Sequence, residues 1–137
     1  MYPLEIVQPM KNDLIQVGFQ ELITATQVDE AIQNTPDSFL VVVNSVCGCA
    51  AANARPGARM SLKNAKKPDH IVTVFAGVDR DAVDQARQHM VPFPPSSPSM
   101  ALFKDGELVH MLERHHIEGR PAELIAENLK DAYNEYC

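Results

Sequence analysis

The sequence predicts an α/β fold in which a central mixed four-stranded sheet is flanked by helices. One observation is a pair of apolar, β-branched segments, Phe39–Val43 and His70–Phe75, separated by helix-forming residues. This pattern is typical of parallel strands joined by a crossover helix. The other observation is the pair Ser99–Lys104 and Glu107–Leu112, joined by Asp105–Gly106, which is a strong signal for a tight antiparallel hairpin.

An extra N-terminal helical segment precedes the first core strand. A short helix is expected around Lys11–Val17, because Gly18 then interrupts the apolar pattern. A second helix is expected over Gln27–Asn34, with Thr26 as its N-cap, since apolar side chains recur there at helical spacing. Pro36–Asp37 predicts the turn that follows.

The central part of the chain alternates strand and helix. Phe39–Val43 is apolar throughout, which is typical of a central strand covered on both faces. A helix is predicted over about Ala50–Ala65, with a kink at Pro56 because proline removes a backbone hydrogen bond. After the second strand, Asp79 is expected to cap a helix that ends near Met90.

The last part of the chain begins with a proline-rich loop, since Pro92–Pro98 holds four prolines in seven residues. The hairpin and a loop over Glu113–Gly119 follow. Pro121 then suits the first position of a C-terminal helix, in which apolar residues recur at helical spacing. No repeat or linker divides the chain, so residues 1–137 are predicted to form a single domain.

The overall composition is that of a globular protein, with 45% hydrophobic and 22% charged residues. The apolar runs are far shorter than the roughly 20 residues that cross a bilayer, so no membrane span is expected. A net charge of −6 argues against a nucleic-acid surface, which needs clustered positive charge. The first residues lack the pattern of a secretory signal, and a cytoplasmic location is therefore expected.

The chemistry-bearing motif is Cys47-Gly48-Cys49, which directly follows the first core strand. Two residues at positions i and i+2 do not share a face of a regular helix, so the pair must lie across an irregular turn. Gly48 gives this turn backbone freedom, and a bent turn could bring the two Cα atoms within the about 4.4–6.8 Å that a disulfide needs. Such a bridge would be strained and redox-labile.

The position of the pair predicts which thiol reacts first. If a helix begins near Cys49, Cys47 lies at its N-terminus, where free N–H groups and the helix dipole stabilise a thiolate. Cys47 is therefore the expected nucleophile and Cys49 the resolving thiol. No role is predicted for Cys137, the last residue.

A basic stripe is predicted on the helix after the cysteines, because Arg55, Arg59 and Lys63 follow one another at intervals of four. A solvated face explains such a stripe. The alternative is a positive field that helps to hold a thiolate or an acidic thiol substrate, with Arg55 as the tuning residue.

Five motifs occur together along the chain and resemble those of the bacilliredoxin family, thioredoxin-like proteins with a Cys-Gly-Cys site. They are NSVCGCAAA in Asn44–Ala52, ARP in Ala54–Pro56, TVFAG in Thr73–Gly77, PSSPSMAL in Pro95–Leu102 and the RH…IEG segment Arg114–Gly119. In this last segment a second histidine, His116, replaces the acidic residue of the family pattern.

The resemblance implies a thioredoxin-like fold and the removal of bacillithiol from S-bacillithiolated proteins. It assigns Cys47 the attack on the mixed disulfide and Cys49 its resolution, with bacillithiol as co-substrate and no tightly bound cofactor. It also implies that Gly48, Ser97 and Pro98 bind the substrate. The Ser97–Pro98 bond is then cis, which leaves the Ser97 backbone free to pair with the thiol substrate.

Other functions remain open at this point. A general protein disulfide isomerase or oxidoreductase would use the same two thiols, and a redox sensor would use their bridge to alter a partner surface. A zinc or copper site would combine the cysteines with His110, His115 or His116, although metal ligands are not the favoured role. His115 could instead tune the thiolate by titrating near neutral pH. The expected partners are thiolated proteins and a low-molecular-weight thiol, with the chain as a monomer or weak homodimer.

Overall fold

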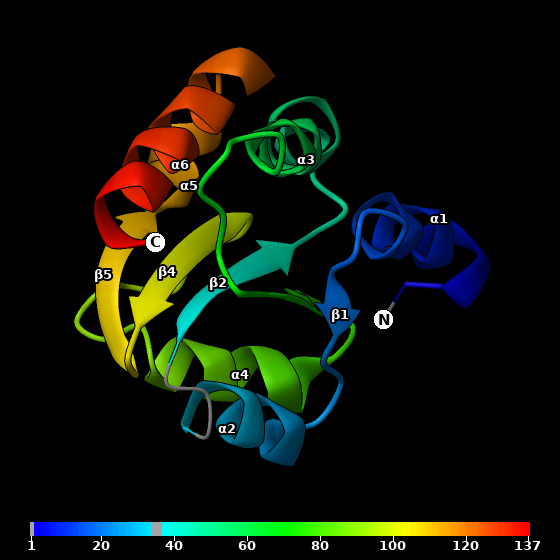
Figure 1. Cartoon of the computed structure of the whole chain (residues 1–137). Coiled ribbons are helices and arrows are strands. Elements are labelled where there is room, and N and C mark those ends of the chain that lie inside the picture. The colour runs from blue at the N-terminus through cyan, green and yellow to red at the C-terminus, as the bar shows by residue number, and fades with distance from the viewer. Residues whose placement is uncertain (1, 34–36) are drawn as a thin grey trace.

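The computed structural model describes residues 2–33 and 37–137. Its centre is a mixed five-stranded sheet in the order β1-β3-β2-β4-β5 (Figure 1). β1, β3 and β2 run parallel, whereas β4 is antiparallel to β2 and to β5. The strands are β1 (Gln20–Glu21), β2 (Ser38–Asn44), β3 (His70–Phe75), β4 (Ser99–Lys104) and β5 (Glu107–Leu112).

Helices cover both faces of the sheet (Figure 1). One face carries the helices near the C-terminus and the helix that follows β2, and the other face carries α2 and α4. The helical elements are α1 (Leu4–Ile15), α2 (Ala25–Gln33), the π-helix η1 (Ala50–Ala54), α3 (Arg55–Ser61), α4 (Arg80–Gln88), α5 (Arg114–Ile117) and α6 (Ala122–Tyr136).

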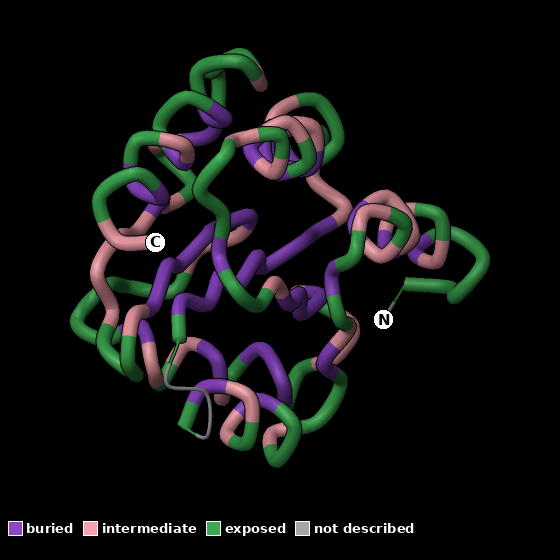
Figure 2. The backbone as a smooth tube through the Cα atoms, in the orientation of Figure 1, coloured by how far each residue is buried: buried purple, intermediate pink, exposed green. Residues whose placement is uncertain are grey.

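β2 is the central strand, and all seven of its residues are buried (Figure 2). Its side chains alternate between two apolar clusters. Leu40 and Val42 pack in the cluster under α3 and α6, whereas Val41 and Val43 pack in the cluster under α2 and α4. The predicted coverage of this strand on both faces is confirmed, and the alternation explains why it is apolar without interruption.

The four predicted strands are present, but the sheet has a fifth, β1, which the sequence did not reveal. β1 is only two residues long, and it pairs Gln20 with Val72 and Glu21 with Thr73. Neither residue is β-branched or apolar, so no strand pattern marks the segment. The predicted four-stranded sheet is therefore corrected to five strands.

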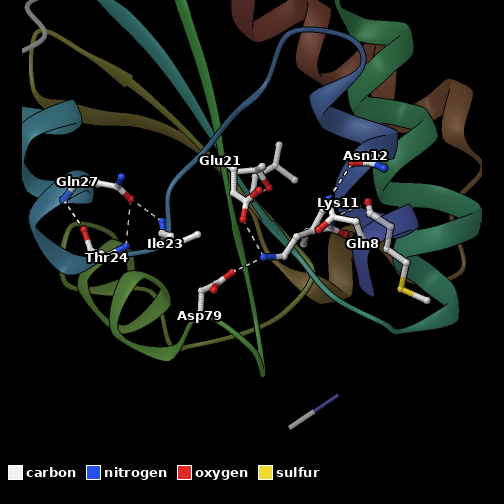
Figure 3. A network of polar contacts seen from close by, with 12 residues as sticks. Gln8, Lys11, Asn12, Glu21, Ile23, Thr24, Gln27 and Asp79 are labelled. Carbon is white, nitrogen blue, oxygen red and sulfur yellow. Dashed lines mark hydrogen bonds and ion pairs between the residues drawn. The ribbon is translucent and has the colours of Figure 1, made fainter. Parts of the chain in front are cut away.

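A buried lysine ties this edge strand to α1 and α4. Lys11 Nζ lies 2.8 Å from Glu21 Oε1 and 2.9 Å from Asp79 Oδ2 (Figure 3). Burial lowers the pKa of Lys11, but the bonds to the two carboxylates outweigh burial and raise it. Asp79 is the N-cap residue of α4, as predicted, yet its carboxylate accepts from Lys11 and makes no cap hydrogen bond.

The N-terminal helices differ from their predicted bounds. α1 begins at Leu4, seven residues before the expected start, and includes Pro9. The side chain that caps α2 belongs to Thr24 and not to Thr26, because Thr24 Oγ1 accepts the Gln27 N–H at 3.1 Å (Figure 3). The predicted end of this helix at Asn34 and the turn residue Pro36 lie outside the described residues.

The predicted helix over Ala50–Ala65 divides into two elements. A π-helical turn, η1, comes first, and the α-helix α3 continues from Arg55 to Ser61. Pro56 is the second residue of α3, which continues directly from η1. The irregularity that the sequence placed at Pro56 is thus a change of helix type.

The β4–β5 hairpin has the predicted bounds. Its turn residues Asp105 and Gly106 both adopt positive φ, 53° and 82°, as a tight hairpin turn requires. The segment expected as a loop after β5 contains the short helix α5. The C-terminal helix α6 begins one residue later than predicted, with Pro121 at its N-cap.

Candidate active site

Both reactive-site thiols lie in the turn between β2 and η1, at the carboxyl end of the central strand. Cys47, Cys49 and Cys137 are free thiols. The Cys47 carbonyl accepts the N–H groups of Ala50 and Ala51 at 2.9 and 3.2 Å, so the helical bonding begins at this residue. Cys47 Sγ in turn accepts the N–H of Cys49 at 3.4 Å. Cys47 therefore lies at the N-terminus of the helical segment, as predicted.

The surroundings of the two thiols shift their pKa values in opposite directions. The pKa of Cys47 is lowered by hydrogen bonds from the Cys49 thiol and backbone and by the charge of Arg114, against the opposing effect of burial. The pKa of Cys49 is raised by burial and by the neighbouring Cys47. Cys47 is consequently the thiol that ionises first, which makes it the better nucleophile.

Arg114 is a site residue to which the sequence reasoning gave no role. Its guanidinium donates through NH2 to Cys47 Sγ at 3.3 Å, through NH1 to the Ser97 carbonyl at 3.0 Å, and through Nε to Glu118 at 2.7 Å. Arg114 is 67 residues from Cys47 in the chain. Only the placement of α5 after the hairpin brings them together, and no spacing rule encodes that contact.

The proline loop places Ser97 beside Arg114. The Ser97–Pro98 peptide bond is cis, as the resemblance implies, and so is Val91–Pro92, which was not predicted. The Ser97 carbonyl accepts a hydrogen bond from Arg114 of α5, a contact that the sequence did not reveal. The pairing of the Ser97 backbone with a thiol substrate stays a prediction.

Arg55 is buried and binds the turn that carries Cys47, and it does not lie on a solvated helix face. It is buried, with Nε 3.1 Å from Asp13 Oδ2 and NH1 3.0 Å from both Asn44 Oδ1 and the Ser45 carbonyl. Ser45 Oγ then accepts the Cys47 N–H at 3.2 Å. The solvated-face interpretation is therefore wrong for Arg55. The guanidinium holds the turn that carries Cys47, and the arginine that contacts the sulfur is Arg114.

Gly48 and His115 were also named as site residues. A Cβ added at Gly48 would meet open space, with no atom within 4 Å, so the position is accessible from outside. His115 is exposed, and its ring packs against His116 with the ring centroids 4.0 Å apart. Its Nε2 lies 3.9 Å from Glu113 Oε2. These neighbours, and not the sulfurs, are the contacts that the structure gives to His115.

Metal-ligating side chains gather away from the cysteines. Within residues 2–33 and 37–137, one group of three potential ligands occurs, Glu113, His115 and His116, and it includes neither thiol. His116 Nδ1 accepts the Glu113 N–H at 3.0 Å, and the Glu113 side chain accepts from the His116 backbone, which together form the capping box of α5. The geometry thus gives Glu113 and His116 a capping role, whereas His115 lies outside the capping box.

A shallow pocket of about 260 Å³ opens beside Cys47. Its walls come from the N-terminal segment, the turn after β3, the proline loop and α5. Ser97 and Arg114 line it together with Cys47. A nucleophilic sulfur, a cation and a cavity therefore meet at one end of the sheet, where ligands bind in open α/β folds.

Known proteins resemble this chain along almost its whole length. The family model described as "Disulphide isomerase" matches residues 2–137. The bacilliredoxin of Cytophaga hutchinsonii is 56% identical over 135 residues, covering 98% of this chain and 99% of that protein. The chain belongs to the bacilliredoxin family. A second member, from Halalkalibacterium halodurans, is 49% identical over 136 residues and covers 99% of this chain and 94% of its own.

Solved structures agree on the fold of this bacilliredoxin family member. Mitochondrial thioredoxin 3 of Saccharomyces cerevisiae has a TM-score of 0.56 at 17% identity, covering 85% of this chain and 94% of its own. Schistosoma mansoni thioredoxin has a TM-score of 0.59 at 16% identity, and the match covers 87% of this chain and 98% of that thioredoxin. The thioredoxin-like fold is confirmed. Together with the family, it identifies the chain as a thiol-disulfide oxidoreductase.

Among the described residues, no helix has the length and apolarity to traverse a bilayer.

Proposed function

We infer that the protein removes bacillithiol from S-bacillithiolated proteins. The Cys47 thiolate attacks the bacillithiol sulfur of the mixed disulfide, so that a Cys47–bacillithiol disulfide forms and the protein thiolate leaves and takes up a proton. Cys49 then loses its proton and attacks Cys47 Sγ. Bacillithiol departs as a thiol, and the resulting Cys47–Cys49 disulfide is reduced by an external thiol.

The observation that carries this proposal is the contrast between the two thiols. Cys47 Sγ receives hydrogen bonds from the Cys49 N–H and from Arg114, and its pKa is lowered, whereas that of Cys49 is raised. A nucleophile and a resolving thiol need this division, since one must be ionised while the other waits. The small-thiol substrate is supported by the name that the relatives of this chain carry.

The test is a mass measurement on wild-type, Cys47→Ser and Cys49→Ser proteins mixed with a bacillithiolated substrate protein. Cys49→Ser should accumulate one bacillithiol adduct on Cys47 while the substrate emerges reduced. Cys47→Ser should leave the substrate modified. Cys137→Ser serves as the matched control and should behave as wild type. A substrate that stays bacillithiolated with the wild-type protein would refute the proposed function.

Protein disulfide isomerisation is a second candidate, which the description of the matching family model favours. It would use Cys47 in the same way but on disulfides between protein cysteines. The two functions separate when the wild-type protein is given scrambled ribonuclease and a bacillithiolated protein in parallel. If the removal of bacillithiol is much faster than the reactivation of ribonuclease, the result supports bacillithiol removal as the function. The reverse result supports disulfide isomerisation.

A further inference from the structure

The pocket beside Cys47 is assembled from segments that lie far apart in the sequence. Tyr2 comes from the N-terminal segment, Ala76 and Gly77 from the turn after β3, and Ser97 from the proline loop. Arg114, on α5, completes it. The pocket holds about 260 Å³, which exceeds the space that the Cys47 sulfur and one attacked sulfur need. Further ligand atoms therefore have room beside the reacting bond.

Tyr2 and Gly77 form one wall of this pocket by close contact. Gly77 has a φ of +83°, and a Cβ at this position would lie 3.1 Å from Tyr2 Cε2. The absence of a side chain at Gly77 therefore lets the aromatic ring lie against the turn. The Tyr2 side chain is nevertheless 44% exposed, so a ligand in the pocket could cover part of the ring and gain apolar contact.

The turn that carries Gly77 is held in place by the buried ion pair of Lys11. Asp79, two residues further on, accepts from Lys11 Nζ at 2.9 Å (Figure 3). Lys11 lies on α1, the helix that directly follows the Tyr2 segment. The ion pair thus joins α1, which follows the Tyr2 segment, to Asp79, which follows the Gly77 turn.

The pocket contains a guanidinium, that of Arg114, whose Nε is paired with Glu118 Oε2 at 2.7 Å. Among the described residues that line it, Arg114 is the one with a cationic side chain, and none is a carboxylate. A guanidinium has five N–H donors, of which Glu118, Ser97 and Cys47 each take one. The remaining donors can bind an incoming carboxylate, the partner that best fits the guanidinium.

We propose that the pocket formed by Tyr2, Gly77, Ser97 and Arg114 binds the small-thiol half of the mixed disulfide and selects thiols that carry a carboxylate. This proposal rests on the proposed function and adds to it the basis of thiol selection. Arg114 attracts the carboxylate, and the Tyr2 ring contacts the part of a larger thiol that extends from the sulfur.

The experiment compares three small thiols of similar size and different charge. One single-cysteine substrate protein is prepared as its mixed disulfide with mercaptoacetate (anionic), 2-mercaptoethanol (neutral) and cysteamine (cationic). Transfer of each to Cys47 of the Cys49→Ser protein is followed by intact mass. Each rate is divided by the rate of reduction by dithiothreitol, which corrects for the intrinsic reactivity of the disulfide.

The corrected rates should decrease from mercaptoacetate to 2-mercaptoethanol to cysteamine, with roughly a fivefold difference between the extremes. Adding Arg114→Gln should bring the three rates within about twofold of one another. Adding Arg59→Gln, a change at an exposed arginine of α3, should keep the preference. Ratios are compared, so a general loss of Cys47 reactivity does not affect the result.

The Tyr2 wall is tested with glutathione, a larger anionic thiol. Tyr2→Ala should slow transfer of glutathione by roughly threefold relative to mercaptoacetate, whereas Leu4→Ala, an exposed change in the same segment, should not. Equal corrected rates for the three small thiols would overturn the pocket proposal and leave dethiolation intact. If no small thiol reaches Cys47, the proposed function fails and the pocket proposal fails with it.

Discussion

At the residue scale, Arg114 is the side chain whose removal tells most about Cys47. Arg114→Gln removes a cation that lies 3.3 Å from the sulfur and helps to lower the thiol pKa. We expect alkylation of Cys47 by iodoacetamide at pH 7 to slow by roughly two- to fivefold, the range of a solvent-exposed charge contact. Arg114→Lys should retain part of the effect, and Arg59→Gln none.

The pH dependence of Cys47 follows from the same contacts. Its pKa lies below the ordinary value of 9.0, so the thiolate persists to lower pH than in an unperturbed cysteine and is lost as pH falls through the folded-state pKa. Above the unfolded-state pKa of Cys47, this thiolate stabilises the reduced folded protein. That contribution is lost as pH falls through the folded-state pKa. When the alkylation rate is measured as a function of pH, the increase for Cys47 should therefore occur at a lower pH than the increase for Cys49, whose pKa is raised. Coincident profiles for the two thiols would contradict this assignment.

At the element scale, Gly57 and Gly48 differ in the space around them: Gly57 is closely packed and Gly48 is open. A Cβ at Gly57 of α3 would lie 2.7 Å from Ile125 Cγ2 of α6, which is inside van der Waals contact. Gly57→Ala should therefore lower the free energy of unfolding by about 1–3 kcal/mol. Gly48→Ala is the matched control and should change it by less than about 0.5 kcal/mol, because that Cβ meets nothing within 4 Å. Urea unfolding of both variants measures the difference, and equal losses would refute the packing argument.

The tie between α1, β1 and α4 depends on Lys11. Lys11→Met leaves Glu21 and Asp79 without their shared cation, so we expect a loss of about 1–3 kcal/mol in the free energy of unfolding. The pKa of Lys11 is raised above 10.5. The contribution of Lys11 is therefore complete below pH 10.5 and is lost as pH rises through the folded-state pKa. Denaturation at pH 7 and at pH 11 should show a smaller difference from wild type at the higher pH, while the exposed Lys63→Met should match wild type at both.

The same elements show what the sequence can and cannot predict. β2, β3 and the hairpin were predictable because burial on both faces, or a turn dipeptide, leaves a local pattern. β1 was missed because two polar residues carry no such pattern. The Cys47–Cys49 turn was predictable from local spacing, but the Arg114 contact depends on long-range topology. The prediction that Arg55 lies on a solvated face was wrong, because charged residues at helical spacing usually mark such a face. Here Asp13 and Asn44 bind the Arg55 guanidinium in the interior.

At the scale of the whole molecule, the two clusters on either side of β2 serve different needs. The cluster under α2 and α4 is closed by the helix that Asp79 begins, so the turn carrying Gly77 is fixed to the core. The cluster under α3 and α6 includes Ala50 and Ala54 of η1, which fixes the cysteine turn. The pocket walls thus come from both halves of the core, and the sheet end at which they meet is where Cys47 reacts.

The sheet edges predict that the protein remains a monomer. β1 offers only two residues to a partner strand, too few to pair stably. The opposite edge strand, β5, pairs with β4 through an irregular register at Leu102 and Phe103. Such irregularities in a strand pair oppose pairing between sheets. Sedimentation velocity at about 10 and 100 µM should give one species of the 15.1 kDa chain. A dimer that persists at the lower concentration would contradict this prediction.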